Sequence, residues 1–165
     1  MTPGPIRAIA IVAALLASGV GARAEPEKAA VFDFQFARGG PTEPSPEERT
    51  RLTRISTVLR DLLRESGRYT LVSTDPVRQK VAEGSDLRAC NGCAEEYARS
   101  LGAEAAITGE VQKVSNLILD LDVYVKPVAD DAPKQACSVD LRGNTDESFD
   151  RAVPHMVENN MSDGP

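Results

Sequence analysis

The chain has 165 residues, 27% of them charged, with 19 basic and 25 acidic residues and a net charge of −6. An acidic chain with no Trp and only 4% aromatic residues has neither the basic surface nor the stacking side chains for nucleic acid, and its charge also argues against anionic lipid. The length is that of one domain with its own hydrophobic core.

The first 24 residues have the three parts of a secretory signal peptide. Arg7 supplies a positive charge, residues 9–16 are apolar, and Ala22-Arg23-Ala24 is an A-x-A-like cleavage site. The apolar run is too short to span a membrane, and no Cys follows it that would take a lipid anchor. We therefore expect a periplasmic protein, or a secreted one if the source lacks an outer membrane. Its mature chain would be residues 25–165, with a net charge of −8 because two basic residues are removed.

The mature chain predicts a single domain, ordered over about residues 29–158. Capping residues, Pro and Gly positions and the spacing of apolar residues mark its elements. In chain order these are a strand (30–36), a helix (45–67), a strand (68–73), a helix (75–83), a helix (94–101), a hairpin of two strands (104–125), a strand (135–142) and a helix that begins at 145. Pro154 should kink or shorten that last helix.

The hairpin gives the clearest strand signal. Leu119, Leu121 and Val123 alternate with Asp120 and Asp122, so one side of the strand is apolar and the other is acidic. The remaining strands alternate in the same way, and we expect the three phenylalanines of residues 30–36 to share one face.

Helices with one apolar side and strands with one apolar face predict an α/β (α+β) fold. We expect a mixed five-stranded sheet with about four helices, in the order strand, helix, strand, helix, helix, three strands, helix. The last three strands should be antiparallel, and a crossover helix should join the first two.

Several segments resemble known families. VFDFQF, LRDLLRESGRYTLVS and LGAEAAITGEV are similar to the amino-terminal domain of the periplasmic protein TolB and to related curli-secretion and penicillin-binding-protein-activator domains. VQKVSNLILDLDVYV and SVDLRGNTDESFDRAV resemble a family of uncharacterised exported bacterial proteins, known as a domain of unknown function, over nearly the whole mature chain. The resemblance implies a small fold like that of anticodon-binding domains, and protein–protein contacts in the cell envelope rather than catalysis.

Cys90 and Cys93 form the sharpest local motif. In an oxidising compartment, a CxxC in a loop between two helices is interpreted first as a structural disulfide. A redox-active pair and free thiols remain alternatives, although the strand that precedes thioredoxin-like motifs is missing. A third alternative is a zinc site in which Cys137 and His155 complete four ligands. Haem attachment is excluded, because Ala94 stands where that motif needs His.

A second set of residues is acidic and polar and lies on predicted strands. Clustered carboxylates can bind cations or serve acid–base chemistry, but the ordinary interpretation is a solvated sheet face. We treat this set as a candidate interaction face. It consists of Asp33, Gln35, Asp120, Asp122, Asp140 and Arg142.

The sequence thus favours a soluble, exported, non-catalytic protein that binds an unknown envelope protein through a sheet face or an exposed edge strand. We expect no catalytic residues, no cofactor and no metal ligands. A thiol–disulfide redox protein that uses the CxxC pair is the first alternative, and a metal-binding protein is the second.

Overall fold

The computed structural model describes residues 25–40, 42–84, 86–129 and 134–161. The predicted signal peptide, residues 1–24, lies outside this part of the chain. The elements are β1 (Glu27–Val31), β2 (Gln35–Phe36), α1 (Pro46–Glu65), β3 (Tyr69–Val72), η1 (Asp75–Val77), α2 (Arg78–Glu83), α3 (Cys93–Ser100), β4 (Ala105–Lys113), β5 (Leu119–Pro127), β6 (Gln135–Leu141), α4 (Asp146–Met156) and η2 (Val157–Met161).

One mixed sheet organises the fold. Its strand order is β3-β1-β4-β5-β6, and the short β2 pairs with β4 beyond the end of β1. The pairs of β1 with β3 and β4 are parallel, whereas β4, β5 and β6 are antiparallel neighbours. The predicted mixed α+β class and element order are confirmed, with the first predicted strand divided into two.

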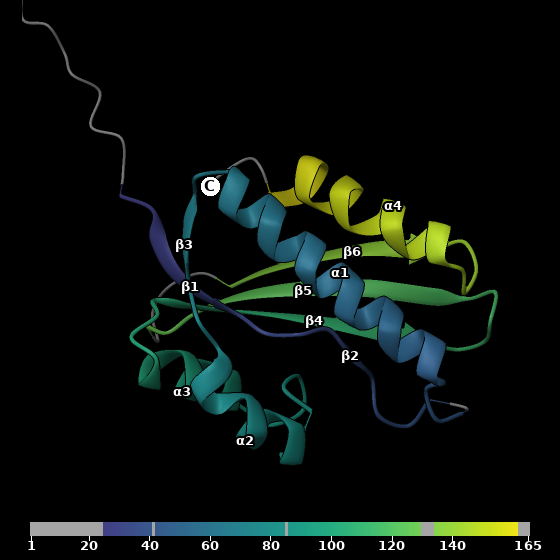
Figure 1. Ribbon diagram of the computed structural model, residues 1–165, viewed down its shortest axis with the longest axis horizontal. Helices are drawn as coiled ribbons and strands as arrows, with labels where there is room; N and C mark the ends of the chain where they lie inside the picture. Colours follow the sequence, from purple (N-terminus) through teal and green to yellow (C-terminus); the bar gives the residue numbers. More distant parts are fainter. Residues whose placement is uncertain (1–24, 41, 85, 130–133, 162–165) are drawn as a thin grey trace, which may run out of the picture.

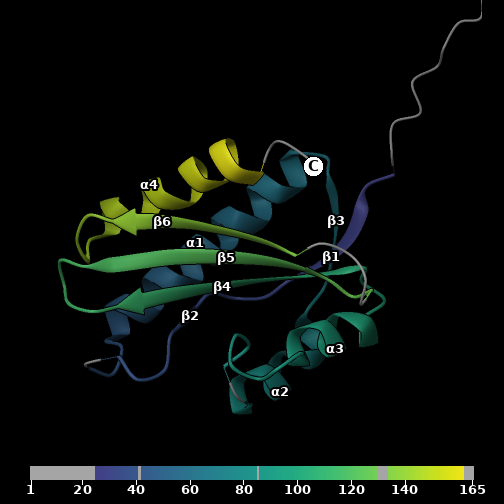
Figure 2. The ribbon, with the colours of Figure 1, turned by 180° about the vertical axis from the view of Figure 1, so that it is seen from behind.

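The helices cover the two faces of the sheet unequally (Figure 1). α1 and α4 lie side by side on one face and enclose the larger core, in which apolar residues of β4, β5 and β6 are buried. α3 packs on the other face only near β1 and the start of β4, where Ala94 and Ala98 meet Ala30 and Ala106. Seen from behind, the rest of β4, β5 and β6 has no described helix over it (Figure 2).

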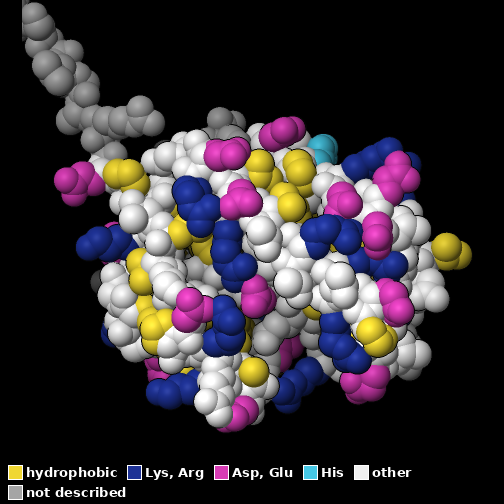
Figure 3. Space-filling view, viewed as in Figure 1, with side chains coloured by type: hydrophobic (Ala, Val, Ile, Leu, Met, Phe, Trp, Pro, Cys, Tyr) yellow, Lys and Arg dark blue, Asp and Glu magenta, His cyan; other side chains and the backbone are white. Residues whose placement is uncertain are grey.

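A capping box begins α1, and ion pairs join α1 to α4. The Ser45 hydroxyl accepts a hydrogen bond from the Glu48 N–H, and the Glu48 carboxylate accepts one from the Ser45 N–H, which is the predicted capping box. Arg51 and Arg54 of α1 pair with Asp146 of α4, at 2.6 and 3.7 Å. Basic and acidic side chains are accordingly interspersed over this side of the molecule (Figure 3).

One extra residue lies between β1 and β2. Val31 pairs with Ile107 and Gln35 pairs with Glu110, so four steps along the first segment match three steps along β4. Such a β-bulge inverts the alternation of the residues that follow it. Gln35 is thereby placed beside Glu110 instead of facing the α1 core.

The bulge makes the predicted common face of the three phenylalanines wrong. Phe32 packs on the α3 side, whereas Phe34 and Phe36 pack on the α1 side. The Phe34 N–H donates to Ser56 Oγ of α1 at 2.9 Å, so α1 satisfies a backbone donor released by the bulge. The Phe34 ring lies so close to Gly109 that a Cβ there would approach it to 2.1 Å.

The last helix accommodates Pro154 near its end. α4 continues for two residues past Pro154 and then passes into the π-helical η2. Pro lacks the backbone donor that an α-helix needs, and π-type turns are one way in which a helix absorbs such a defect. Within the described residues, no helix is long and apolar enough to cross a membrane.

Candidate functional site

The uncovered part of the sheet carries polar side chains on all three of its strands. We call this surface the open face. The antiparallel register aligns its residues in rows that run across the strands. The open face comprises Thr108, Glu110 and Gln112 of β4, Asp120, Asp122 and Tyr124 of β5, and Ser138 and Asp140 of β6.

Two like-charged pairs lie next to each other on the open face. Glu110 is directly opposite Asp122, and Asp120 is directly opposite Asp140. Carboxylates in such cross-strand positions repel each other, which destabilises a sheet unless something compensates their charge. Gln112 provides one compensation, because its amide donates to Asp122 Oδ2 at 2.8 Å.

Burial and neighbouring charges alter the acidity of two of these groups. Burial raises the pKa of Glu110, whose side chain is nearly inaccessible, and the charge of Asp86 adds to this effect. Burial also raises the pKa of Asp120, as does its hydrogen bond with Asp140. The open face therefore contains carboxyl groups whose ionised form is disfavoured in the free protein.

Arg88 is the basic residue that crosses this acidic surface. Its guanidinium lies 4.3 Å from the centroid of the Tyr124 ring, and its Nε is 3.9 Å from Glu110 Oε2. A cation over an aromatic face and beside a carboxylate is held by both. Arg88 belongs to the loop that precedes α3, so this loop reaches over one end of the open face.

The Cys90–Cys93 segment fastens that loop. The two cysteines are joined as a disulfide with their Cα atoms 5.6 Å apart, at the start of α3. Just before them, Leu87 is buried and its N–H donates to Gln35 Oε1 at 3.0 Å. The disulfide and this hydrogen bond together restrict the backbone that carries Arg88.

The cysteines of the alternative zinc site lie on opposite faces of the sheet. Cys137 is buried in the core on the α1 side, and its thiol points to the Asn160 carbonyl at 3.6 Å. Cys93 packs into the cluster on the opposite face of the sheet. Within the described residues, no three His, Cys, Asp or Glu side chains come together to hold a metal ion.

The structure separates the six predicted interaction residues. Asp120, Asp122 and Asp140 lie on the open face, and Gln35 lies beside it in the row of Glu110. Asp33 does not join them, because it keeps the face of Val31, which lies on the α1 side, and it pairs there with Arg60 at 2.6 Å.

Arg142 follows the end of β6. It lies with Asp140 in a groove beside α4. The predicted set therefore divides between the open face, this groove and the α1 side of the sheet.

Sequence reasoning missed the tip of the β4–β5 hairpin. Val114, Leu117 and Ile118 are 64%, 80% and 57% exposed, and they are the exposed large hydrophobic residues of the described chain. The tip is the turn at the right-hand end of the sheet in Figure 1, and apolar side chains project at that end in Figure 3. Three apolar residues around a Ser-Asn turn were a detectable signal.

A buried polar network holds the base of this tip. Glu48 Oε1 accepts hydrogen bonds from Lys113 Nζ and Asn144 Nδ2, both at 2.6 Å. Asn144 in turn donates its backbone N–H to the Asn116 carbonyl in the turn, at 2.9 Å. Burial favours the neutral carboxyl of Glu48, but the hydrogen bonds from Lys113 and its other donors outweigh it and lower the pKa.

Comparison with known proteins assigns the chain to a family. Residues 27–161 match the family described as "Protein of unknown function (DUF2380)", and the chain belongs to it. This confirms the expected membership of a family without a known activity. No curated protein matches the sequence.

Two solved structures share the fold. The LpoB C-terminal domain from Salmonella enterica is similar with a TM-score of 0.50 and 16% identity, over 72% of this chain and 86% of that domain. Lipoprotein GNA1162 from Neisseria meningitidis is similar with a TM-score of 0.50 and 12% identity, over 81% of this chain and 98% of that one. The likeness is one of fold alone, and it is to these domains and not to TolB specifically.

Proposed function

We propose that this protein is an exported, non-catalytic accessory protein of the cell envelope that binds a partner protein through its open face. The observation that carries the proposal is the helix-free side of β4, β5 and β6, on which the half-buried Asp120 and the exposed Asp140 form a like-charged pair. Thr108, Glu110 and Asp122 of the same face are buried. A partner that supplies basic side chains would relieve the repulsion between Asp120 and Asp140, so binding and charge compensation would occur together.

Other features support the same function. The sequence begins with a segment that has the composition of a secretory signal, and one protein of similar fold is named a lipoprotein. Within the described residues, many charged side chains form ion pairs, and a disulfide closes the loop between Cys90 and Cys93. The one His, His155, is exposed on α4. An adaptor that works by surface contact accounts for this set of features.

The test is affinity capture of the mature chain from its native envelope, with the Asp120→Asn, Asp140→Asn double variant alongside. We expect a partner that is recovered with the natural protein and is reduced about tenfold with the double variant, as loss of one or two charge pairs would produce. Asp33→Asn is the matched control, because Asp33 lies on the α1 side of the sheet. Failure to recover any partner across replicates, or equal loss with Asp33→Asn, would contradict the proposal.

The same preparation tests export. Mass spectrometry of the envelope fraction should find a chain that begins near Glu25, since cleavage after Ala24 is expected. An uncleaved chain confined to the cytoplasm would be inconsistent with an envelope role.

A further inference from the structure

β6 forms a long open edge of the sheet. It is the last strand of the order β3-β1-β4-β5-β6 and pairs on one side with β5 along all seven of its residues. In the described part of the chain, no hydrogen bond joins the backbone of β6 to any segment other than β5. Every second residue of an antiparallel edge strand directs its N–H and C=O outward, so β6 offers a row of unpaired backbone groups.

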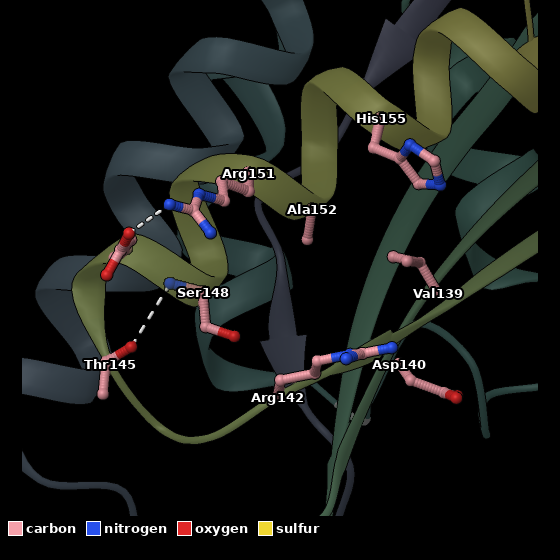
Figure 4. Close-up of a pocket in the computed structure, with 9 residues that line it drawn as sticks. Val139, Asp140, Arg142, Thr145, Ser148, Arg151, Ala152 and His155 are labelled. Carbon is pink, nitrogen blue, oxygen red and sulfur yellow. Dashed lines mark hydrogen bonds and ion pairs between the residues drawn. The ribbon is translucent and has the colours of Figure 1, made fainter.

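A groove of about 530 Å³ runs between this edge and α4 (Figure 4). Ser148, Ala152 and His155 project from α4 toward the strand, where they face Val139. Ala152 is 4% exposed and Val139 is half-buried, so the inner part of the groove is apolar and shallow. It fits small apolar side chains better than large or charged ones.

The charges near the groove are arranged unevenly. Arg151 forms an ion pair with Glu147 of the preceding helical turn, so these two side chains compensate each other. Arg142 also lines the groove, but no ion pair joins it to Asp140 among the described residues, and the residue opposite Asp140 is Asp120. An incoming basic side chain would therefore be attracted to the open-face side of β6.

A second copy of the chain does not match these charges. β6 contains Asp140 and no Lys or Arg, and antiparallel pairing of two β6 edges about their midpoint, Ser138, would set Arg142 of one copy opposite Lys134 of the other. Like charges in such cross-strand positions repel each other. A strand with basic side chains would match the charge of this edge better. The side chains on one face of that strand would lie in the groove, and those on its other face would lie on the open face.

We propose that β6 and the groove beside it receive an extended segment of the partner protein, which pairs with β6 as an additional strand. Its side chains alternate, with small apolar residues against Val139 and Ala152 and basic residues beside Asp140. This inference rests on the proposed binding function and specifies how the partner is held. Backbone hydrogen bonds would give affinity, and the two sets of side-chain contacts would give specificity.

The probe for the test is a labelled heptapeptide of alternating lysine and valine, titrated into the mature protein and followed by fluorescence anisotropy. We expect saturable binding that becomes about tenfold weaker when alternate backbone amides of the peptide are N-methylated, since these lose their hydrogen bonds. Ser148→Trp, which fills the groove, should weaken binding by a similar factor. Ser100→Trp is the matched control on the exposed end of α3 and should leave binding unchanged. Hydrogen exchange of residues 135–141 should slow in the complex.

Three results would overturn the inference. The first is the absence of saturable binding, and the second is binding that is insensitive to both N-methylation and Ser148→Trp. The third is a dimer by light scattering that Ser148→Trp dissociates, because a second copy would then cover the edge.

The envelope capture separates this inference from the proposed function. If Ser148→Trp recovers the partner at the natural level while the Asp120, Asp140 double variant does not, the edge-strand mode fails and binding through the open face stands.

Discussion

At the scale of single residues, the open face is built from carboxylates that oppose each other. Glu110 is buried, and Asp122 lies directly opposite it on β5. The charge of Asp86 also acts on Glu110, and Arg88 is the basic residue beside it. The raised pKa of Glu110 means that its charged form is less stable in the folded protein than in the unfolded chain. This residue therefore reduces the free energy of unfolding at neutral pH.

The pH dependence of Glu110→Gln tests this relation. As the pH falls, Glu110 takes up its proton at a higher pH in the folded protein than in the unfolded chain. The loss of stability that its charge causes therefore decreases as the pH passes through the folded pKa, and it is gone below the ordinary Glu pKa of about 4.3. We expect Glu110→Gln to be about 1 kcal/mol more stable than the natural protein at pH 7. The difference should vanish near pH 4 in urea unfolding experiments. Glu96→Gln, on the exposed side of α3, is the control, and an equal gain there would contradict the explanation.

At the scale of elements, the β4–β5 hairpin joins an acidic face to an apolar tip. The hydrogen bonds of Glu48, Lys113 and Asn144 fasten the base of the tip, which lowers the conformational entropy that its covering would cost. Exposed apolar side chains that lie together on a turn are typical of interaction sites.

Leu117→Ser with Ile118→Ser tests the tip. Both side chains are exposed, so the free energy of unfolding should change by no more than about 0.5 kcal/mol. Recovery of the partner in the capture experiment should fall several-fold if the tip is part of the contact. A large loss of stability would show instead that these side chains support the fold, and unchanged recovery would remove the tip from the contact surface.

At the scale of the whole molecule, the disulfide connects the start of α3 to the loop beside the open face. The Cys90–Cys93 bridge closes a short loop that holds Arg88 over Tyr124, on the opposite face of the sheet from the buried thiol of Cys137. A short loop of this kind contributes about 2 kcal/mol or less to stability. Its main effect is to restrict one segment beside the open face.

Measurement of the reduction potential tests this role. A structural bridge should have a potential below about −300 mV, whereas a value near −200 mV would indicate a thiol–disulfide oxidoreductase. We also expect the Cys90→Ser, Cys93→Ser double variant to remain folded, with a melting temperature only a few degrees lower. Loss of the fold in this variant would mean that the bridge does more than restrict the loop.

Local patterns in the sequence determined most of the secondary structure and the fold class. The capping box at Ser45 and the alternation of Leu119 to Val123 with Asp120 and Asp122 depend on neighbouring residues, so they are visible without the fold. The same alternation placed Asp120, Asp122 and Asp140 on one polar side of their strands.

Only the tertiary structure decided which faces are covered and which residues meet. The bulge after Val31 brings Phe34 to the α1 side and Gln35 beside Glu110, and a bulge depends on the register with β4, which lies some 75 residues away along the chain. The contact of Phe34 with Gly109, the position of Arg88 on Tyr124 and the groove between β6 and α4 arise from the same long-range packing. Alternation in one strand identifies two sides, but the placement of the helices determines which side remains open.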